Sequence, residues 1–299
     1  MIQFLLFTAT LLGLAALVRR TGIADSLADN LNWWVLNVAL PAMALELLPS
    51  LHPHPSLWFL VVSQWSLFAL TALLCRWLGR RLGWTRERIG AVTLLAALSN
   101  TAFIGLPLLD ALRGSAAVSL GLLADQLGCF IALVVGGSVI TAVYSGDRVD
   151  GAGIVRKLLL CPAFIAAIVG LAVGALGGWP DAVPPVLHRL SQTLTPLALF
   201  SVGLRFRLHA RPDERPAIAL TLVWKLGAMP LVVLLAGHAL GVQGLTLTVG
   251  VLQSAMPSMF AAAILIRQHG LEAEMADTTL SVGMLLAFAT VPTWSLFLP

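Results

Sequence analysis

The sequence predicts an all-α polytopic membrane protein of ten transmembrane helices, arranged as two inverted repeats of five. Three observations predict it: the composition, the spacing of the apolar runs, and motifs that recur at a nearly constant offset. Of the 299 residues, 59% are hydrophobic and 11% are charged, and the mean hydropathy is +0.92. Soluble domains have about 25% charged residues. The composition therefore excludes a soluble enzyme and a nucleic-acid-binding protein.

Helices that cross a bilayer need about 20 predominantly apolar residues. The predicted spans are 3–18, 32–48, 57–78, 89–110, 116–143, 158–178, 189–204, 216–240, 245–266 and 277–298. The first run is expected to remain as a membrane span because Arg19 and Arg20 follow it, whereas the charges of a cleaved signal peptide precede its apolar core.

The basic residues predict the orientation of the spans. With the N-terminus outside, most of the 18 Lys and Arg residues lie in the connections after spans one, three, five, seven and nine, and the opposite side has only Arg113 and Arg189. Lys and Arg are retained on the cytoplasmic side of membranes. We therefore expect a multi-pass protein of the inner (plasma) membrane with both termini non-cytoplasmic.

Three motifs of the first half recur in the second half. The matched pairs are 12–15 with 169–172, 41–45 with 196–200, and 100–114 with 256–270. Each half has five predicted spans, and an odd number places the second copy in the opposite orientation. The predicted organisation is a first repeat over 1–145, a cytoplasmic connection over 146–157 and a second, inverted repeat over 158–299.

Spans four and nine contain the polar, proline-interrupted segments that predict a binding site. Span four has Asn100, Thr101, Gly105 and Pro107 within eight residues of one another, and proline and glycine loosen a helix and free backbone groups. Span nine has a similar polar segment interrupted by proline, with Gln253, Ser254, Met256, Pro257 and Ser258. Interrupted helices at matching places in two repeats indicate a transporter's substrate site, and opposed half-helix ends suit a carboxylate.

Ionisable side chains in the middle of spans predict a role in coupling. Asp125, followed by Gln126, is the deepest carboxylate, and Lys225 lies about as deep in span eight. Asp125 is expected to bind a proton or a cation such as sodium; a static ion pair with Lys225 is the alternative. The three cysteines, Cys75, Cys129 and Cys161, have no metal-ligand spacing. No metal, nucleotide or other cofactor is expected beyond the coupling ion.

Span four resembles a signature of the auxin efflux carrier family, which includes the plant PIN auxin transporters and bacterial carriers of small organic anions. The stretch 99–109 with Gly114 is similar to its N-T-x-x-x-G-x-P-L-L…G pattern. Further similar stretches are Asn32 with Pro41, the segment 200–204, and the segment 255–257 through to Gly270.

The resemblance implies a bile-acid/sodium-symporter-like fold in which interrupted spans four and nine cross near Pro107 and Pro257. It also implies that spans three to five and eight to ten move against the other four, and that Asn100 contacts a substrate carboxylate. The sequence departs from the plant pattern in two places: the central connection is short, and Ser258 and Met259 follow Pro257 in place of a Gln-Gly pair. The short connection and compact length favour a bacterial source, and the second departure puts auxin itself in doubt.

The sequence thus predicts a secondary active transporter that moves a small organic anion, a mono- or dicarboxylate that is auxin-like or malonate/malate-like, by elevator-type alternating access. Its expected partners are that anion and the lipid bilayer; no nucleic acid is expected, and a homodimer is a possible assembly. The alternatives are a ligand-binding membrane sensor or receptor and a channel. An intramembrane enzyme is disfavoured because no paired acids, metal ligands or activated nucleophile share one depth.

Overall fold

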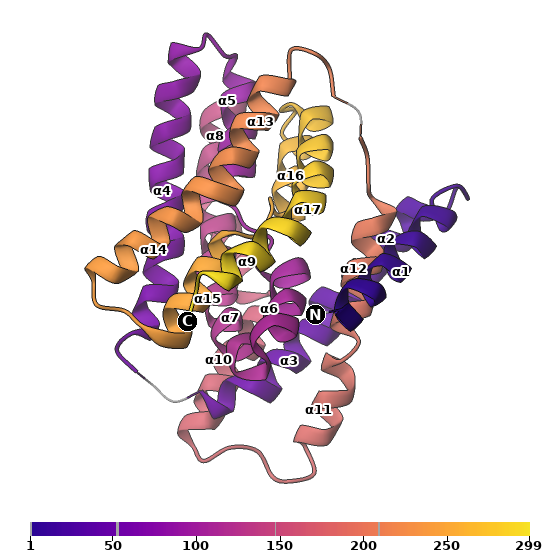
Figure 1. Ribbon diagram of the computed structural model, residues 1–299, viewed down its shortest axis with the longest axis vertical. Helices are drawn as coiled ribbons and strands as arrows, with labels where there is room; N and C mark the ends of the chain where they lie inside the picture. The colour runs from indigo at the N-terminus through magenta and orange to yellow at the C-terminus, as the bar shows by residue number, and fades with distance from the viewer. Residues whose placement is uncertain (1, 52–53, 147, 209) are drawn as a thin grey trace.

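The computed structural model describes residues 2–51, 54–146, 148–208 and 210–299, and these residues form helices joined by short connections (Figure 1). Within the described ranges there is no β-strand, only one isolated bridge between two connections. The prediction of an all-α protein is therefore confirmed.

Each predicted span falls on one or more helices. The helices are α1 (Ile2–Val18), α2 (Ala24–Trp34), α3 (Leu40–Leu47), α4 (Leu57–Arg81), α5 (Arg86–Ala97), α6 (Leu106–Arg113), α7 (Ser115–Leu123), α8 (Ser138–Ser145), α9 (Gly151–Leu159), α10 (Pro162–Ala175), α11 (Pro184–Ser191), α12 (Leu194–Leu204), α13 (Arg215–Val223), α14 (Met229–Ala239), α15 (Gly244–Ser254), α16 (Phe260–Gln268) and α17 (Ala273–Leu296). Short, differently wound turns extend or join several of them: η1 (Val35–Ala39), η2 (Leu48–Ser50), η3 (Thr101–Gly105), η4 (Ala124–Cys129), η5 (Ala132–Gly137) and η6 (Trp224–Ala228).

Length and apolar character identify the helices that can cross a membrane. Five continuous helices qualify among the described residues: 24–50, 57–81, 115–145, 215–239 and 273–296. A sixth is obtained if α9 and α10, which are bent by 57° relative to each other, count as one span. The chain is thus a multi-pass membrane protein by composition and helix length. The full count of ten spans stays a prediction, since the other predicted spans fall on shorter or interrupted helices.

Local sequence signals explain where several helices begin and end. Thr85 starts α5, because its hydroxyl accepts the Arg88 N–H at 3.2 Å and satisfies one of the free donors of the first turn. Asp150 caps α9 in the same way through the Gly153 N–H at 3.0 Å. The predicted connection 146–157 is therefore partly helical. The second predicted span is also longer than expected, since its helix already begins at Ala24.

The helices pack as two groups. In one group α1 and α2 pack against α12, while α3 packs against α10 and α11. In the other group α4, α5 and α8 pack together with α13, α15, α16 and α17, and α6 packs against α7. Figure 1 shows α1, α2 and α12 on one side and α4, α5 and α13 on the other. The first group holds the helices of predicted spans one, two, six and seven, and the second group holds those of the other spans. That the two groups move against each other stays a prediction.

Ion pairs tie the second group to the connection between α12 and α13. The Arg88 side chain donates to Glu272 at 2.9 Å and to Asp213 at 2.7 Å. The hydrogen bonds that Glu272 and Asp213 accept from Arg88 raise the pKa of Arg88, and the Arg88 guanidinium holds the pKa of Asp213 below its usual range. Arg88 therefore fixes the start of α5 to two segments that are distant in the sequence.

Candidate functional site

Two helix interruptions meet in the middle of the second group. The first is at residues 98–101, from the end of α5 to the first residue of η3, and the second is at residues 255–259, between α15 and α16; we call this place the crossing. The Asn100 N–H donates to the Pro257 carbonyl at 2.7 Å, and the Met259 N–H donates to the Leu98 carbonyl at 3.0 Å. Backbone groups that a broken helix leaves free inside a membrane need partners in the protein. Here each interruption supplies partners for the other.

The two predicted prolines have different places in this arrangement. Pro257 lies in the crossing itself and accepts a backbone hydrogen bond there. Pro107 lies in the first turn of α6, where a missing N–H costs little. Its ring excludes a normal hydrogen bond to the carbonyl four residues earlier, and the wide turn η3 precedes it. The chain therefore breaks at 98–100, before Pro107.

Asn100 has one half of its amide occupied and the other half free. Its Oδ1 accepts the Phe103 N–H at 3.2 Å and caps η3. Its Nδ2 is buried and has no hydrogen-bond partner among the residues that the structure describes. Only 1% of the residue is exposed. A buried amide donor without a partner costs about 1–3 kcal/mol, so Asn100 has an unused hydrogen-bonding capacity at the crossing.

Thr101 and the turn η4 form a polar group beside Asn100. The Thr101 hydroxyl donates to Asp125 Oδ1, and Gln126 Nε2 donates to Asp125 Oδ2 at 2.6 Å. All three side chains are buried. Within the described ranges Gln126 Oε1 has no partner. Asp125 lies on a π-helical turn, a feature that often occurs at functional sites. The structure thus joins Thr101, predicted at the substrate site, to Asp125 and Gln126, predicted to act in coupling.

Lys225 also reaches the crossing, but it does not pair with Asp125. Its Nζ donates to Ser99 Oγ at 2.7 Å and lies 3.4 Å from Met229 Sδ. The residue is 0% exposed, on the π-helical turn η6. In the described part of the chain no carboxylate lies within ion-pair distance of its ammonium group. The static ion pair that the sequence offered as an alternative is therefore not formed.

Gln253 fits against two glycines of the first repeat. Its Nε2 donates to the Gly121 carbonyl at 3.1 Å, and its Oε1 is buried without a partner in the described ranges. A Cβ on Gly105 would lie 2.4 Å from Gln253 Oε1, and one on Gly121 would lie 2.9 Å from Gln253 Nε2. Only glycine leaves room for the amide at these two positions.

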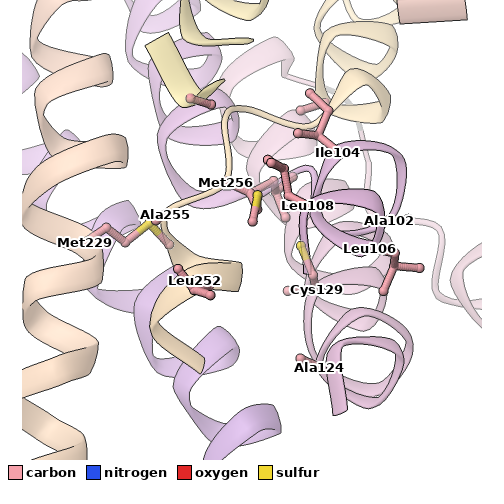
Figure 2. Packing of buried hydrophobic residues seen from close by; sticks show 14 of the residues in the cluster. Ala102, Ile104, Leu106, Leu108, Ala124, Cys129, Met229, Leu252, Ala255 and Met256 are labelled. Carbon is pink, nitrogen blue, oxygen red and sulfur yellow. The ribbon is translucent and has the colours of Figure 1, made fainter. Parts of the chain in front are cut away.

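The other predicted residues of span nine are engaged within the protein. Ser254 Oγ donates to the Val251 carbonyl of its own helix, and Ser258 Oγ donates to the Leu95 carbonyl of α5, both at 2.7 Å. Met256 belongs to the apolar cluster around the crossing. Figure 2 shows this cluster, which includes Ala102, Ile104, Cys129 and Met229 as well as Ala255 and Met256. The polar groups of the crossing are therefore surrounded by apolar side chains.

Two vestibules lie between the helix groups. The first, of about 360 Å³, is named here the Arg205 vestibule and is lined by Asp25, Asp29, Arg205, Arg207, Phe260, Ala263, Ile264, Arg267, Gln268, Asp277 and Leu280. The second, of about 480 Å³, is named the Glu46 vestibule and is lined by Phe7, Met43, Glu46, Leu47, Leu106, Asp110, Ser115, Val118, His188, Ser191, Gln192, Thr195 and Pro196.

The vestibules open toward opposite ends of the helices. Asp29 and Glu46 lie on the same continuous helix and are separated along it by about 25 Å at 1.5 Å per residue. Each vestibule also reaches one half of the crossing region: Phe260 begins α16, directly after the second interruption, and Leu106 begins α6, after the first. The polar side chains at the crossing are buried, and the helix starts that follow the two interruptions, at Leu106 and Phe260, line one vestibule each.

Sequence reasoning missed Ser99 and Gly121. Ser99 is the hydroxyl partner of Lys225, and its carbonyl accepts from Cys129 Sγ at 3.2 Å. A polar residue directly before Asn100 in an apolar span was an available signal for Ser99. Gly121 has no such signal, because its role depends on how Gln253 packs. Among the described residues no group of three or more His, Cys, Asp or Glu side chains is arranged to hold a metal ion.

Comparison with known proteins decides the family. A family model described as "Membrane transport protein" matches residues 3–147 and 152–295. The chain belongs to this family, the auxin efflux carrier family. The two matched segments are separated by residues 148–151, around the start of α9, and together they cover nearly the whole chain.

Individual relatives in the family are distant. The chain is 26% identical to a protein of Methanothermobacter thermautotrophicus named an uncharacterized transporter, over 91% of this chain and 89% of that protein. It is 21% identical to an uncharacterized transporter of Methanocaldococcus jannaschii, over 70% of this chain and 68% of that protein. It is also 26% identical to auxin efflux carrier component 1 of Arabidopsis thaliana, over 44% of this chain but only 22% of the plant protein.

Proposed function

We propose that the chain is a secondary active transporter of a small organic anion, a mono- or dicarboxylate, with its substrate site at the crossing. It acts as a carrier and not as an enzyme, in the inner (plasma) membrane with both termini outside. The observation that carries the proposal is the buried Asn100 Nδ2, which has no hydrogen-bond partner among the described residues, in a crossing from which one helix leads to each of the two vestibules.

The helix ends at the crossing support an anionic substrate. η3 with α6 and α16 both begin there, so the N-terminal ends of two helical segments face one region. Free N–H groups and the helix dipole make such ends favourable for a carboxylate. Asn100 and Thr101 would contact the substrate, with Gln253 and Ser258 from the other interruption. Gly105, Pro107, Ser254, Met256 and Pro257 would shape the site.

The two helix groups support an elevator-type movement. The crossing lies within the second group, and the vestibules lie between the groups. Movement of the second group past the first would connect the crossing to the Arg205 vestibule in one state and to the Glu46 vestibule in the other. The buried side chains between the vestibules favour such a carrier over a channel, which needs a continuous pore.

Asp125 and Gln126 would couple this movement to a proton or a sodium ion. Asp125 is buried and receives two hydrogen bonds, from Thr101 and Gln126. Thr101 also belongs to the crossing. Binding of a proton or cation at Asp125 would therefore alter the Thr101–Asp125 hydrogen bond and, with it, the substrate site.

The test is current from proteoliposomes on a solid-supported membrane, challenged with malonate, malate, succinate, lactate and indole-3-acetate. The measurement is repeated with and without sodium and with a pH step. A saturable current that Asn100→Ala reduces supports the proposal, and its dependence on sodium or pH identifies the coupling ion. Binding of an anion without current or exchange would favour a receptor, and current without saturation would favour a channel.

A further inference from the structure

Lys225 is a buried basic residue that forms no ion pair with any residue that the structure describes. It is 0% exposed, and among the described residues the hydrogen-bond partners of its Nζ are a hydroxyl and a thioether, those of Ser99 and Met229. An ammonium group has three donors, and a buried charge without an opposite charge costs several kcal/mol. The protein therefore keeps a basic residue at a buried place where no described carboxylate would neutralise its charged form.

Lys225 lies at the crossing, next to the proposed substrate site. Its hydrogen bond goes to Ser99, and the next residue is Asn100, whose Nδ2 also lacks a partner in the described part of the chain. Two consecutive residues of one interruption are thus involved: Ser99 accepts a hydrogen bond from the basic group, and Asn100 carries the unused amide donor. The carboxylate of Asp125 accepts hydrogen bonds from Thr101 and Gln126. It is therefore not the acceptor for Lys225 Nζ or for Asn100 Nδ2.

We propose that Lys225 is a substrate-binding residue that supplies the positive charge for the substrate carboxylate and makes the carrier select anions over their neutral analogues. One carboxylate oxygen would accept from Lys225 Nζ and the other from Asn100 Nδ2. The inference rests on the proposed transport function and adds to it the residue that recognises charge. Met229, four residues along the same helix, would support the aliphatic part of the lysine side chain.

The experiment measures inhibition of labelled-anion counterflow in proteoliposomes by the unlabelled anion and by its fully amidated analogue. The labelled probe is whichever of malonate, malate, succinate, lactate and indole-3-acetate gives the largest wild-type counterflow. Wild type should prefer the acid over the amide by about 10- to 100-fold, the value of one charge-assisted hydrogen bond. In Lys225→Met this preference should fall to about one, because the affinity for the acid falls while the affinity for the amide changes little.

The chain offers a matched control, since its other lysine, Lys157, is exposed on α9. Lys157→Met should keep the wild-type preference. Lys225→Gln keeps a donor for Ser99 without the charge, and it replaces Lys225→Met if that variant does not give a monodisperse protein. The wild-type protein alone can already overturn the inference. It does so if the amide inhibits counterflow as well as the acid does.

The outcomes separate this inference from the proposal on which it rests. Wild-type counterflow with an unchanged acid preference in Lys225→Met or Lys225→Gln overturns the role of Lys225 and leaves the transport function standing. Loss of the preference in either variant, with Lys157→Met unaffected, supports it. No counterflow of any of the five anions in wild type overturns the proposed function, and the inference with it.

Discussion

Replacing Asn100 with alanine separates binding from folding, because the two halves of its amide have different roles. Loss of Oδ1 removes the cap on the Phe103 N–H, which costs about 1 kcal/mol. Loss of Nδ2 removes a buried donor that has no partner in the described part of the chain, which returns about 1–3 kcal/mol. The two terms oppose each other, so the ligand-free variant should melt within about 4 °C of wild type.

Substrate affinity should respond much more strongly. A donor to a carboxylate is worth about 1.5–3 kcal/mol, so Asn100→Ala should raise the dissociation constant about 10- to 150-fold. The assay is the melting temperature of the purified protein, with and without a titrated anion from the panel. Asn100→Asp keeps the capping oxygen but replaces the donor with an acceptor, and it should bind the anion no better than Asn100→Ala.

Asn37→Ala is the matched control for this series. The Asn37 amide lies on the helix between α2 and α3, and it donates to the Trp33 carbonyl at 2.8 Å. Its substitution should leave the anion-induced shift intact. An unchanged dissociation constant in Asn100→Ala, combined with a large loss of ligand-free stability, would refute the reasoning, since Asn100 would then act only as a structural cap.

Three further predictions concern coupling, packing and pH. Asp125→Asn should make transport insensitive to the pH or sodium gradient while anion counterflow continues, measured in the same proteoliposomes. Gly105→Ala should lower the melting temperature by about 2–6 °C, because its Cβ would lie 2.4 Å from Gln253 Oε1 and overpacking costs about 1–3 kcal/mol. The pKa of Asp213 is lowered by Arg88, so its contribution to stability is present above about pH 4 and is lost as the pH falls through the lowered pKa; Asp213→Asn should lower the melting temperature at pH 7 and should lower it less at pH 3.

Each of these predictions has an outcome that contradicts it. A gradient dependence that survives in Asp125→Asn would leave Asp125 a structural residue. Gly227 lies on η6 with open space around its Cβ position, so Gly227→Ala is the control for Gly105→Ala, and equal melting temperatures would show that Gln253 moves aside at no cost. An equal effect of Asp213→Asn at both pH values would show that its ion pair with Arg88 contributes nothing.

Local sequence features predicted the helix interruptions. Apolar runs, with polar residues and prolines at matching places in both halves, were enough to locate the interruptions around Asn100 and Pro257. The exact position of the break was harder to predict, because Pro107 is compatible with the first turn of a helix. The helix is interrupted before Pro107, at 98–100. The place of proline alone therefore does not fix where a helix opens.

Contacts between distant residues could not be predicted from one sequence. Lys225 and Asp125 lie deep in their predicted spans, and a static pair between them is the alternative that the sequence leaves open beside a coupling role for Asp125. The structure instead joins them to neighbouring positions of one interruption, Lys225 to Ser99 and Asp125 to Thr101. Which hydroxyl each charge meets depends on the rotation and packing of three helices. The fit of Gln253 against its glycines depends on the same packing.

The measurement that tests the account most directly is counterflow of a labelled anion in proteoliposomes loaded with the same unlabelled anion. The account predicts saturable uptake for at least one anion of the panel, accelerated by anion on the opposite side and reduced in Asn100→Ala. Trans-acceleration requires a site that faces the two sides in turn, which neither a receptor nor a channel provides. Saturable anion binding without any counterflow would contradict the account and identify a receptor.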